Sequence, residues 1–242
     1  PDIVMHLATY PNAKMVARNV ADATTNMVTA TASILNLCVK SNVKRIVFAS
    51  SSMAYGEFNG GIPDENVMCN PNTLYGSYKH QGERTCQIWK REHGLEYVIM
   101  RPSALYGTRD MVTRVISQMT KSALTRNQIT VQGPENRLDF SNVTDVADAF
   151  ARAATIDVAA NEIFNCTRGY GRTILEAAEL VRDTLGKGEI QTKPHDPFYP
   201  NRDTLNSDKI KTLLGWNPTV DIEQGIPEYV EWFLQQKCYN EK

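Results

Sequence analysis

Residues 42–56, NVKRIVFASSSMAYG, decide the fold of this chain. The segment Val43–Ala49 is rich in apolar and β-branched side chains, a composition that predicts a buried strand. The strand runs directly into Ser50, Ser51 and Ser52, so hydroxyl groups stand where it ends. Because parallel sheets bind ligands at the carboxyl ends of their strands, this segment predicts a site immediately after the strand.

Strands and helices alternate on both sides of this segment. Before it, Ile3–Ala8 is a short apolar run typical of a buried strand, and apolar residues recur at helical spacing over Asp22–Val39. After it, Tyr75–Glu92 has the pattern of a helix that ends at Gly94, and Leu95–Met100 has the pattern of a further strand. This alternation predicts an α/β fold with a doubly wound parallel sheet covered by helices.

The second half of the chain is more helical and less regular. Thr173 is a candidate N-cap with Glu176 three residues later, the spacing of a capping box. Gly215 is placed to end a short helix. The expected elements are five helices and one short strand, at Met111–Leu124, Val143–Ala154, Thr173–Leu185, Ser207–Leu214, Asp221–Gln236 and Ile129–Val131 respectively.

The composition excludes several classes of protein. Of the 242 residues, 42% are hydrophobic and 22% charged, with a net charge of −1, so neither a disordered chain nor a nucleic-acid-binding surface is expected. No apolar run approaches the length of a transmembrane helix, and no signal-peptide pattern opens the chain. The five cysteines are widely spaced without a Cys-x-x-Cys pair, which argues against a zinc site and a disulfide framework. We therefore expect a reduced, cytoplasmic protein without a metal.

Tyr75 and Lys79 form a Tyr-x-x-x-Lys pair close to the start of a predicted helix. A spacing of four residues places both side chains on one helical face, and an ammonium group beside a phenol lowers the phenol pKa from about 10. A phenolate near an alcohol can act as a general base. A serine such as Ser51 can hydrogen-bond the same alcohol and orient it.

The same pattern occurs a second time, at Tyr10 and Lys14. Taken alone, either match is compatible with a surface pair that has no function. Pro11 disfavours a continuous helix through the first match. Only Tyr75 lies downstream of a strand that ends in serines, so the context favours the second match as the functional one.

These motifs, in this order, resemble the extended short-chain dehydrogenase/reductases, which include the NAD-dependent nucleotide-sugar epimerase/dehydratase family. Ser51 lies four residues before Tyr55 and matches the family's catalytic serine or threonine, while Tyr75 and Lys79 match its catalytic pair. The resemblance covers essentially the whole chain. The other matching positions are His6–Ala8, Asn26, Phe48–Gly56, Arg101–Gly107 and Leu214–Pro218.

The resemblance implies a cofactor and a reaction. NAD, with NADP left open, would accept a hydride while Tyr75 takes the proton from a sugar hydroxyl, commonly at C4. Lys79 would bind the nicotinamide ribose, and Ser51 would hydrogen-bond the reacting oxygen. In an epimerase the keto sugar then turns over and the hydride returns to its other face. The implied cofactor-binding residues are Leu7, Ala8, Thr9, Asn26, Ala49, Ser50, Tyr75, Lys79 and Pro102.

Departures from the family's pattern reduce the number of reactions that the chain is expected to catalyse. Members that dehydrate carry an Asp-Glu pair just after the catalytic serine or threonine, where this chain has Ser52 and Met53. The related decarboxylases place a glutamate at the position of Met53. Without these carboxylates, dehydration and decarboxylation are disfavoured, which leaves epimerisation or simple oxidation and reduction.

The substrate-binding positions also depart from the family. Ala104 stands where many members have an asparagine, and Leu138 stands where many have an arginine for the nucleotide phosphates. Arg137 and Arg202 are the remaining candidates for a bidentate grip on a diphosphate. The expected substrate-binding set adds the strand-end serines and two positions where the nucleotide base packs, giving Ser51, Ser52, Ala104, Thr130, Gln132, Arg137 and Arg202.

The largest departure from the family's pattern is at the N-terminus of the chain. The family fold begins with a strand, a Gly-x-x-Gly-x-x-Gly turn and a helix that holds the pyrophosphate, and no such glycine pattern occurs here. Residues 1–8 match the fourth strand of the family, so we expect an N-terminally truncated, partial Rossmann sheet and a smaller α+β substrate-binding domain. The expected division is 1–108 with about 139–165 for the partial NAD-binding domain, and 109–138 with 166–242 for the substrate-binding domain.

The leading hypothesis is an NAD-dependent nucleotide-sugar epimerase, possibly incomplete as this chain. Two alternatives stay open: a dehydrogenase or reductase of the same fold acting on another substrate, and a non-catalytic domain that binds a partner or a nucleotide sugar. The helices near residues 19–39 and 75–92 are the family's usual dimer surface, so a homodimer is expected.

Overall fold

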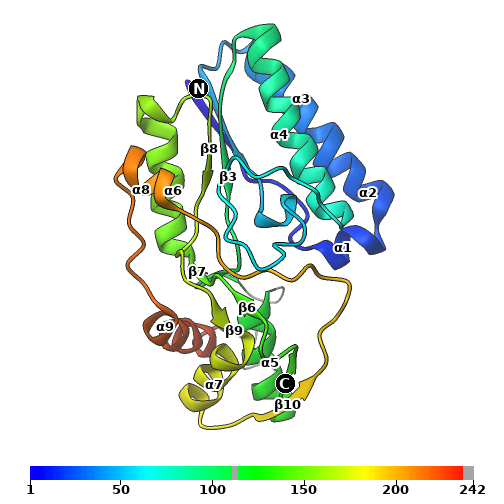
Figure 1. The fold of residues 1–242 in the computed structure, drawn as a ribbon, viewed down its shortest axis with the longest axis vertical. Helices are drawn as coiled ribbons and strands as arrows, with labels where there is room; N and C mark the ends of the chain where they lie inside the picture. The colour runs from blue at the N-terminus through cyan, green and yellow to red at the C-terminus, as the bar shows by residue number, and fades with distance from the viewer. Residues whose placement is uncertain (111–113, 237–242) are drawn as a thin grey trace.

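A four-stranded parallel sheet lies at the centre of one half of the molecule (Figure 1). The structure, a computed structural model, describes residues 1–110 and 114–236. The strands are β1 (Ile3–His6), β2 (Arg45–Ala49), β3 (Glu96–Arg101) and β8 (Glu162–Asn165), in the order β1-β2-β3-β8. All neighbouring pairs are parallel, which confirms the parallel sheet predicted from the alternation of strands and helices.

Strand β2 shows how the sequence places helices on both faces of this sheet. Ile46 and Phe48 are buried in one apolar cluster with α3 (Ala30–Lys40) and α4 (Leu74–His93). The residue between them points to the opposite face, because side chains alternate along a strand, and packs with α6 (Val143–Thr155). Figure 1 shows α3 and α4 on one side of the sheet and α6 on the other, so the sheet is doubly wound.

The helix expected over residues 22–39 is a continuous helical run that changes register. Helix α2 (Val20–Thr24) leads into a π-helical turn (Thr25–Thr29), which α3 follows directly. A π turn holds more residues than an α turn, so it rotates the side chains before it relative to those after it. Asn26 lies on this turn, is exposed, and donates its amide to the carbonyl oxygen of Asp22 at 2.9 Å.

Helix α4 begins and ends where the local sequence predicts. The hydroxyl of Thr73 caps it by accepting from the N–H of Gly76 at 3.1 Å. Gly94 follows with φ of 76°, a left-handed conformation that glycine adopts readily and that ends helices. The cap places Tyr75 in the first turn of α4.

The second half of the chain is built around a separate apolar core. It contains the parallel pair β5 (Gln128–Gln132) and β10 (Glu189–Lys193), packed with α5 (Val115–Arg126), α7 (Ile174–Leu185) and α9 (Ile222–Leu234). Figure 1 places these elements below the sheet, at the ends of β3 and β8.

The helix boundaries in this half largely follow the predictions. The capping box of Thr173 and Glu176 is present at the start of α7, which confirms that prediction. The helix expected from Met111 begins at Val115, with Arg114 as its N-cap, and residues 111–113 lie outside the described part of the chain.

Several short elements lack a clear sequence pattern and were not expected. Helix α1 (Ala13–Arg18) has only six residues, and β8 (Glu-Ile-Phe-Asn) and β10 (Glu-Ile-Gln-Thr-Lys) lack the continuous apolar run that marks β1 and β2. The remaining short elements are β4 (Leu105–Tyr106), β6 (Arg137–Leu138), β7 (Ser141–Asn142), β9 (Arg172–Thr173) and the 3₁₀ turns Ser52–Ala54 and Asp157–Ala159.

The chain returns to the sheet near its end, which differs from the expected division into domains. Helix α8 (Asp208–Leu214) and Trp216 share a buried cluster with Val98 and Met100 of β3. The indole N–H of Trp216 donates to the carbonyl oxygen of Asp145 at 2.8 Å. Residues around 208–216 therefore pack with the sheet, although they fall within the segment expected to bind substrate; the other domain boundaries stay predictions.

Candidate active site

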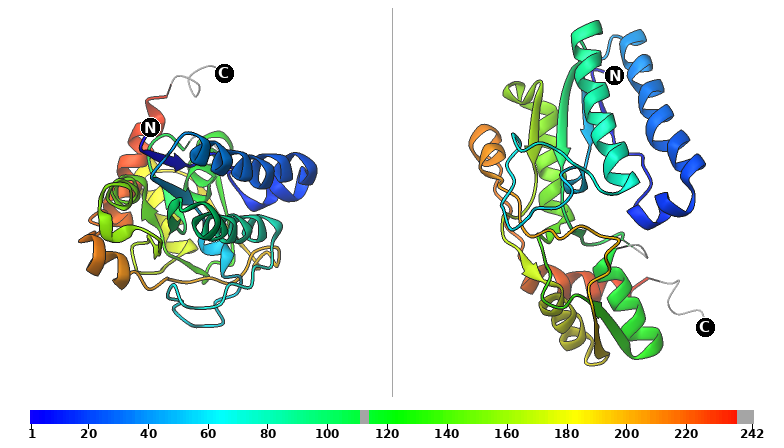
Figure 2. Two further views of the ribbon diagram at one scale, coloured as in Figure 1. Left: turned by 90° about the horizontal axis from the view of Figure 1, so that it is seen from above. Right: turned by 45° about the vertical axis from the view of Figure 1, so that its right-hand side comes forward.

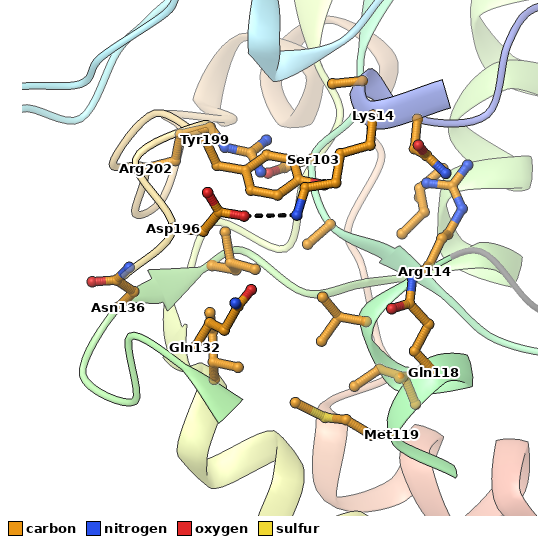
Figure 3. Close-up of a pocket in the computed structure, with 18 of the residues that line it drawn as sticks. Lys14, Ser103, Arg114, Gln118, Met119, Gln132, Asn136, Asp196, Tyr199 and Arg202 are labelled. Atoms are coloured by element: carbon orange, nitrogen blue, oxygen red, sulfur yellow. Dashed lines mark hydrogen bonds and ion pairs between the residues drawn. The ribbon is translucent and has the colours of Figure 1, made fainter. Parts of the chain in front are cut away.

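A cavity of about 850 Å³ lies between the carboxyl end of the sheet and the second half of the chain. One wall comes from the loops after β2 and β3 and from the start of α4, and the other from α5, β5 and residues 195–202 (Figure 3). All seven residues expected to bind substrate line this cavity: Ser51, Ser52, Ala104, Thr130, Gln132, Arg137 and Arg202. The structure brings these residues together, and their individual roles stay predictions.

Tyr75, Ser51 and Lys79 meet at the sheet end of the cavity. Tyr75 and Ser51 both line it, and the Ser51 side chain is one of the groups that lower the pKa of Tyr75. Lys79 lies one turn further along α4 and is buried, with its Nζ 5.8 Å from the centre of the Tyr75 ring. The same Nζ donates to the carbonyl oxygen of Ala49 at 2.6 Å, which holds the ammonium group beneath the phenol.

Two arginines, rather than the lysine expected from the sequence, supply the charges that lower the pKa of Tyr75. Burial raises the pKa of the Tyr75 phenol above its ordinary value. The charge of Arg114, the hydrogen bond with Ser51 and the charge of Arg202 each lower this pKa. Burial also lowers the pKa of Lys79 to about 7.

Gly76 allows α4 to approach the loop that carries the serines. A Cβ at this position would lie 2.2 Å from the carbonyl oxygen of Met53, closer than real side chains come. We expect Gly76→Ala to push the start of α4 away from this loop and to separate Tyr75 from Ser51. Because a displacement of about 1 Å can cost a factor of about 10² in rate, kcat should fall by about that factor. Steady-state kinetics against Ser77→Ala, an exposed neighbour, would test this, and an unchanged kcat in the alanine variant of Gly76 would refute it.

A buried ion pair fixes α4 against the strand ends. Nε and Nη2 of Arg101 donate to the two carboxylate oxygens of Glu83 at 2.8 and 2.6 Å, and the Ser50 hydroxyl donates to the same carboxylate. Cys69 and His80 lie beside Glu83, with potential metal-ligand atoms of the three within 4.8 Å of one another. Because both oxygens of Glu83 are bonded to a guanidinium group, we assign this cluster to the ion pair and not to a metal.

His6 is buried at the end of β1, where its Nε2 lies 3.0 Å from the hydroxyl of Thr31. Burial, and to a smaller extent the charge of Lys79, lowers the pKa of His6 from 6.5 to about 4. The folded state thus holds a neutral imidazole, whereas the unfolded chain takes up a proton near pH 6.5. The folded state therefore loses stability as the pH falls from 6.5 toward 4.

We expect this loss to appear in urea unfolding at about pH 7 and about pH 4.5. The native protein should lose about 2–3 kcal/mol more than His6→Gln between the two values, because about 1.4 kcal/mol corresponds to one unit of pKa. His93→Gln, which changes an exposed histidine, should behave like the native protein. Equal losses in the native protein and in the His6 variant would contradict the expectation.

The expected cofactor-binding residues gather mainly at the carboxyl ends of β1, β2 and β3. After β1, Leu7 and Ala8 are exposed, and the hydroxyl of Thr9 is buried without a hydrogen-bond partner among the described residues. An unpaired hydroxyl beside exposed apolar side chains suits a ligand lying across the strand ends. The residues present therefore fit the nicotinamide side of NAD.

Other residues expected to bind the cofactor form hydrogen bonds within the protein. The carbonyl of Ala49 accepts from Lys79, and the carbonyl of Pro102 accepts from the N–H of Ser52 at 2.9 Å. Asn26 points along its own helix, so in the described structure it does not join the strand-end group. Within the expected cofactor set, Tyr75 lines the cavity.

Lys14, Asp196 and Tyr199 line the cavity without having been expected there. The Lys14 Nζ lies 2.6 Å from an Asp196 carboxylate oxygen and 5.1 Å from the centre of the Tyr199 ring (Figure 3). Helix α1 begins after Pro11, which confirms that Tyr10 and Lys14 do not share a helix. Lys14 and Asp196 are 182 residues apart in sequence, so local patterns carry no signal for this contact.

The fold and the site together define the class of protein. A Rossmann-like parallel sheet, a serine at a strand end and a Tyr-x-x-x-Lys pair on the following helix are the arrangement of an extended short-chain dehydrogenase/reductase. The family model for the NAD dependent epimerase/dehydratase family matches residues 1–167. The chain belongs to this family, which confirms the resemblance and the NAD cofactor that the motifs implied.

Curated relatives agree with this assignment. A protein of Methanocaldococcus jannaschii named "Putative UDP-glucose 4-epimerase" is 35% identical over 240 residues, covering 96% of this chain and 76% of that protein. A dTDP-glucose 4,6-dehydratase of Streptomyces niveus is 27% identical, covering 98% of this chain and 71% of that protein.

Solved structures share the fold. The UDP-glucose 4-epimerase of Thermotoga maritima, solved with UDP-glucose, has a TM-score of 0.90 and 29% identity, covering 97% of this chain and 78% of that one. The UDP-glucose 4-epimerase of Thermus thermophilus, solved with NAD, has a TM-score of 0.90 and 26% identity with the same coverage.

Proposed function

We propose that the protein is an NAD-dependent epimerase that inverts one carbon of a nucleotide sugar, C4 by preference. The observation that carries the proposal is that Tyr75 and Ser51 line the same cavity as all seven expected substrate-binding residues. Two relatives named as UDP-glucose 4-epimerases, from Methanocaldococcus jannaschii and Thermotoga maritima, support the same reaction.

In the proposed reaction the residues of the chain handle the proton. Ser51 holds the sugar oxygen by a hydrogen bond, and the Tyr75 oxygen takes the hydroxyl proton and later returns it. Burial keeps the pKa of Tyr75 above its ordinary value, and the charges of Arg114 and Arg202 reduce this rise. When bound, NAD supplies the hydride acceptor and donor. Lys79 and the strand-end residues would hold its nicotinamide side.

The residues beside Ser51 argue against dehydration. Ser52 and Met53 occupy the positions where dehydrating relatives carry an acidic pair, and neither can act as a carboxylate acid or base. The Ser52 hydroxyl accepts from Arg202 Nη1 at 2.9 Å and lies 3.3 Å from the Ser103 hydroxyl. The site thus has proton-transfer groups for oxidation and reduction of an alcohol, without a second pair for loss of water.

Arg137 and Arg202 are the proposed ligands of the diphosphate. Both line the cavity, and the Nε of Arg202 is buried without a hydrogen-bond partner among the described residues. Arg137 lies 3.4 Å from a carboxylate oxygen of Asp203 and donates to the carbonyl of Gly171. An unpaired buried donor is costly, so an oxygen of the bound diphosphate is a favourable partner for Arg202.

The test follows the configuration at C4 in the full-length protein with NAD added. Conversion of UDP-glucose or a related nucleotide sugar into its C4 epimer, seen by NMR without net formation of NADH, is the expected result. NADH formed in proportion to product would instead establish the second candidate, a dehydrogenase or reductase. Calorimetry that shows no binding of NAD would refute both enzyme functions and leave a non-catalytic binding domain.

We also propose that the protein is a homodimer through the surface of α3 and α4. The two helices lie side by side on one face (Figure 2), with Leu37 60% exposed and Leu74 43% exposed. Light scattering at micromolar concentration should give twice the mass of the chain, and Leu37→Glu should shift the protein toward the monomer. Lys40→Glu, on the exposed end of α3, is the charge control. A monomeric native protein would refute this proposal.

We propose a cytoplasmic location because the described cysteines are free thiols. Cys38, Cys69, Cys86 and Cys166 are all free thiols in the structure, which suits a reducing compartment. Among the described residues, every helix is too short or too polar to cross a membrane.

A further inference from the structure

Asp139 is a carboxylate buried without a countercharge, directly after the short strand β6. The residue is 0% exposed, and no Lys or Arg of the described residues forms an ion pair with it. Moving a carboxylate from water into the interior of a protein is costly unless hydrogen bonds replace its hydration. The donors that surround Asp139 are therefore the reason that the fold can hold it.

Hydrogen bonds from two distant segments meet at one oxygen of Asp139. Its Oδ2 accepts from the N–H of Gly169 at 3.0 Å and from the hydroxyl of Thr204 at 2.6 Å. The N–H of Leu205 lies 3.5 Å from the same oxygen, and the hydroxyl of Ser141 lies 3.5 Å from Oδ1. The carboxylate thus joins the turn after β8 to the segment that contains Thr204 and Leu205.

Arg202 belongs to the segment that this carboxylate holds. It precedes Thr204 by two residues, and its side chain lines the cavity (Figure 3). Its Nη1 donates to the hydroxyl of Ser52 at 2.9 Å, while its Nε is buried without a hydrogen-bond partner among the described residues. The position of this guanidinium group is therefore set largely by the backbone of its own segment.

The two segments joined at Asp139 also carry polar partners of Arg137. Its Nε lies 3.4 Å from a carboxylate oxygen of Asp203, and its Nη2 donates to the carbonyl oxygen of Gly171. A Cβ at Gly171 would lie 1.8 Å from the same oxygen of Asp203, so the segments are in close contact at this point. A change at Asp139 would therefore reach the surroundings of both arginines proposed to bind the diphosphate.

We infer that Asp139 is a positioning residue, whose carboxylate holds the segment of Arg202 in the place where that guanidinium group binds the substrate diphosphate. The inference rests on the proposed function and assigns a role in substrate binding to a residue outside the cavity lining. Hydrogen bonds to an ionised acceptor are roughly twice as strong as those between neutral groups. An asparagine at this position keeps the shape but has one acceptor oxygen and turns an amide toward donors, so the segment should lose its fixed place.

The test is a double-mutant cycle on the affinity for UDP, which carries the diphosphate without the sugar. Calorimetry on the full-length protein with NAD gives dissociation constants for the native protein, Asp139→Asn, Arg202→Gln and the double variant. Asp139→Asn alone should weaken UDP binding about 10-fold, the factor expected for about one hydrogen bond to a charged group. In the Arg202→Gln background the same change should alter the affinity by less than about threefold, because the group that it positions is already gone.

Asp145→Asn is the matched control. Asp145 is also buried, and its Oδ2 accepts from the N–H groups of Thr219 and Val220 at 3.0 and 2.9 Å, but none of these three residues lines the cavity. Both asparagine variants should lower the melting temperature, and only Asp139→Asn should weaken UDP binding. A role in folding alone would give the same result for the two variants.

Thr204→Val gives the same readout should Asp139→Asn not fold, because it removes the closest donor and leaves the carboxylate in place. It should weaken UDP binding about threefold in the native background and leave it unchanged in the Arg202→Gln background. Additive effects in either cycle would overturn the inference, because the network would then act on UDP independently of Arg202. Native UDP affinity in both Asp139→Asn and Thr204→Val would overturn it as well.

The C4 epimerisation of UDP-glucose by the native protein, followed by NMR, tests the proposed function separately. Coupled losses of UDP affinity without epimerisation would overturn the proposed function and support the positioning role of Asp139. Epimerisation with additive losses would overturn the positioning role and support the proposed function. A native protein that binds neither UDP nor UDP-glucose would overturn both.

Discussion

Replacement of Tyr75 by phenylalanine should lower kcat by about 10³-fold while leaving the affinity for NAD within about threefold of the native value. The phenol oxygen is the group placed to take the proton, and general acid–base catalysis contributes a factor of about 10²–10⁴. The phenyl ring keeps the packing of Tyr75 in the cluster with Val16, Ala23 and Met27, so folding should be preserved. Single-turnover kinetics and calorimetry would measure the two effects separately.

Tyr78→Phe is the matched control, because it removes a phenol one turn away on the same helix. The Tyr78 hydroxyl lies 2.9 Å from the hydroxyl of Thr24 and is not part of the cavity lining. We expect this variant to keep near-native turnover. Full turnover in Tyr75→Phe, or an equal loss in the two variants, would show that the Tyr75 oxygen is not the base.

The second large effect is expected from Glu83→Gln. Glu83 is 1% exposed and Arg101 3% exposed, so removing the negative charge leaves a guanidinium group buried without a countercharge. Breaking one side of a buried ion pair costs about 3–5 kcal/mol of stability. The same change also weakens the bond that holds Ser50, next to the proposed catalytic serine. Urea unfolding would measure the loss.

Glu92→Gln is the control for this change, since it removes a glutamate from an exposed pair with Arg91 on the same helix. The exposed pair should contribute at most about 1 kcal/mol. A double variant with leucine at both Glu83 and Arg101 should recover part of the loss, because no charge is then left buried. Similar losses for Glu83→Gln and Glu92→Gln would show that the buried pair does not stabilise the fold.

The central strands of the sheet were predictable because their apolar residues form continuous runs. In β2, Ile46, Val47 and Phe48 are buried on both faces, which produces the continuous apolar run seen in the sequence. Strand β8 was missed because polar residues at both ends leave only two apolar residues in Glu-Ile-Phe-Asn. Its place in the sheet depends on pairing with β3, which is a tertiary contact.

Motifs carried the prediction of the active site. Ser51 and Tyr75 were predicted from a strand end and a helix start, and the structure places both on the lining of one cavity. Arg114 was not recognised, because a lone arginine after a turn has no distinguishing pattern. Arg114 and Tyr75 line the same cavity only because α5 packs below the sheet. Asn26 was predicted to bind the cofactor but does not lie with the strand-end residues. It falls on a π turn that no local pattern predicts, and its side chain is exposed.

The return of residues 208–216 to the sheet has a mechanical consequence. The chain passes between the sheet and the second apolar core after β3, before α6, after β8 and once on each side of α8. The two halves of the molecule are therefore connected at several places. A hinge motion is absorbed by a few residues in the connecting segments. Any change in the shape of the cavity would therefore have to move all of these segments together. In the proposed reaction a keto sugar has to turn over inside the cavity, so the dimensions of the cavity limit which sugar rings can complete the cycle.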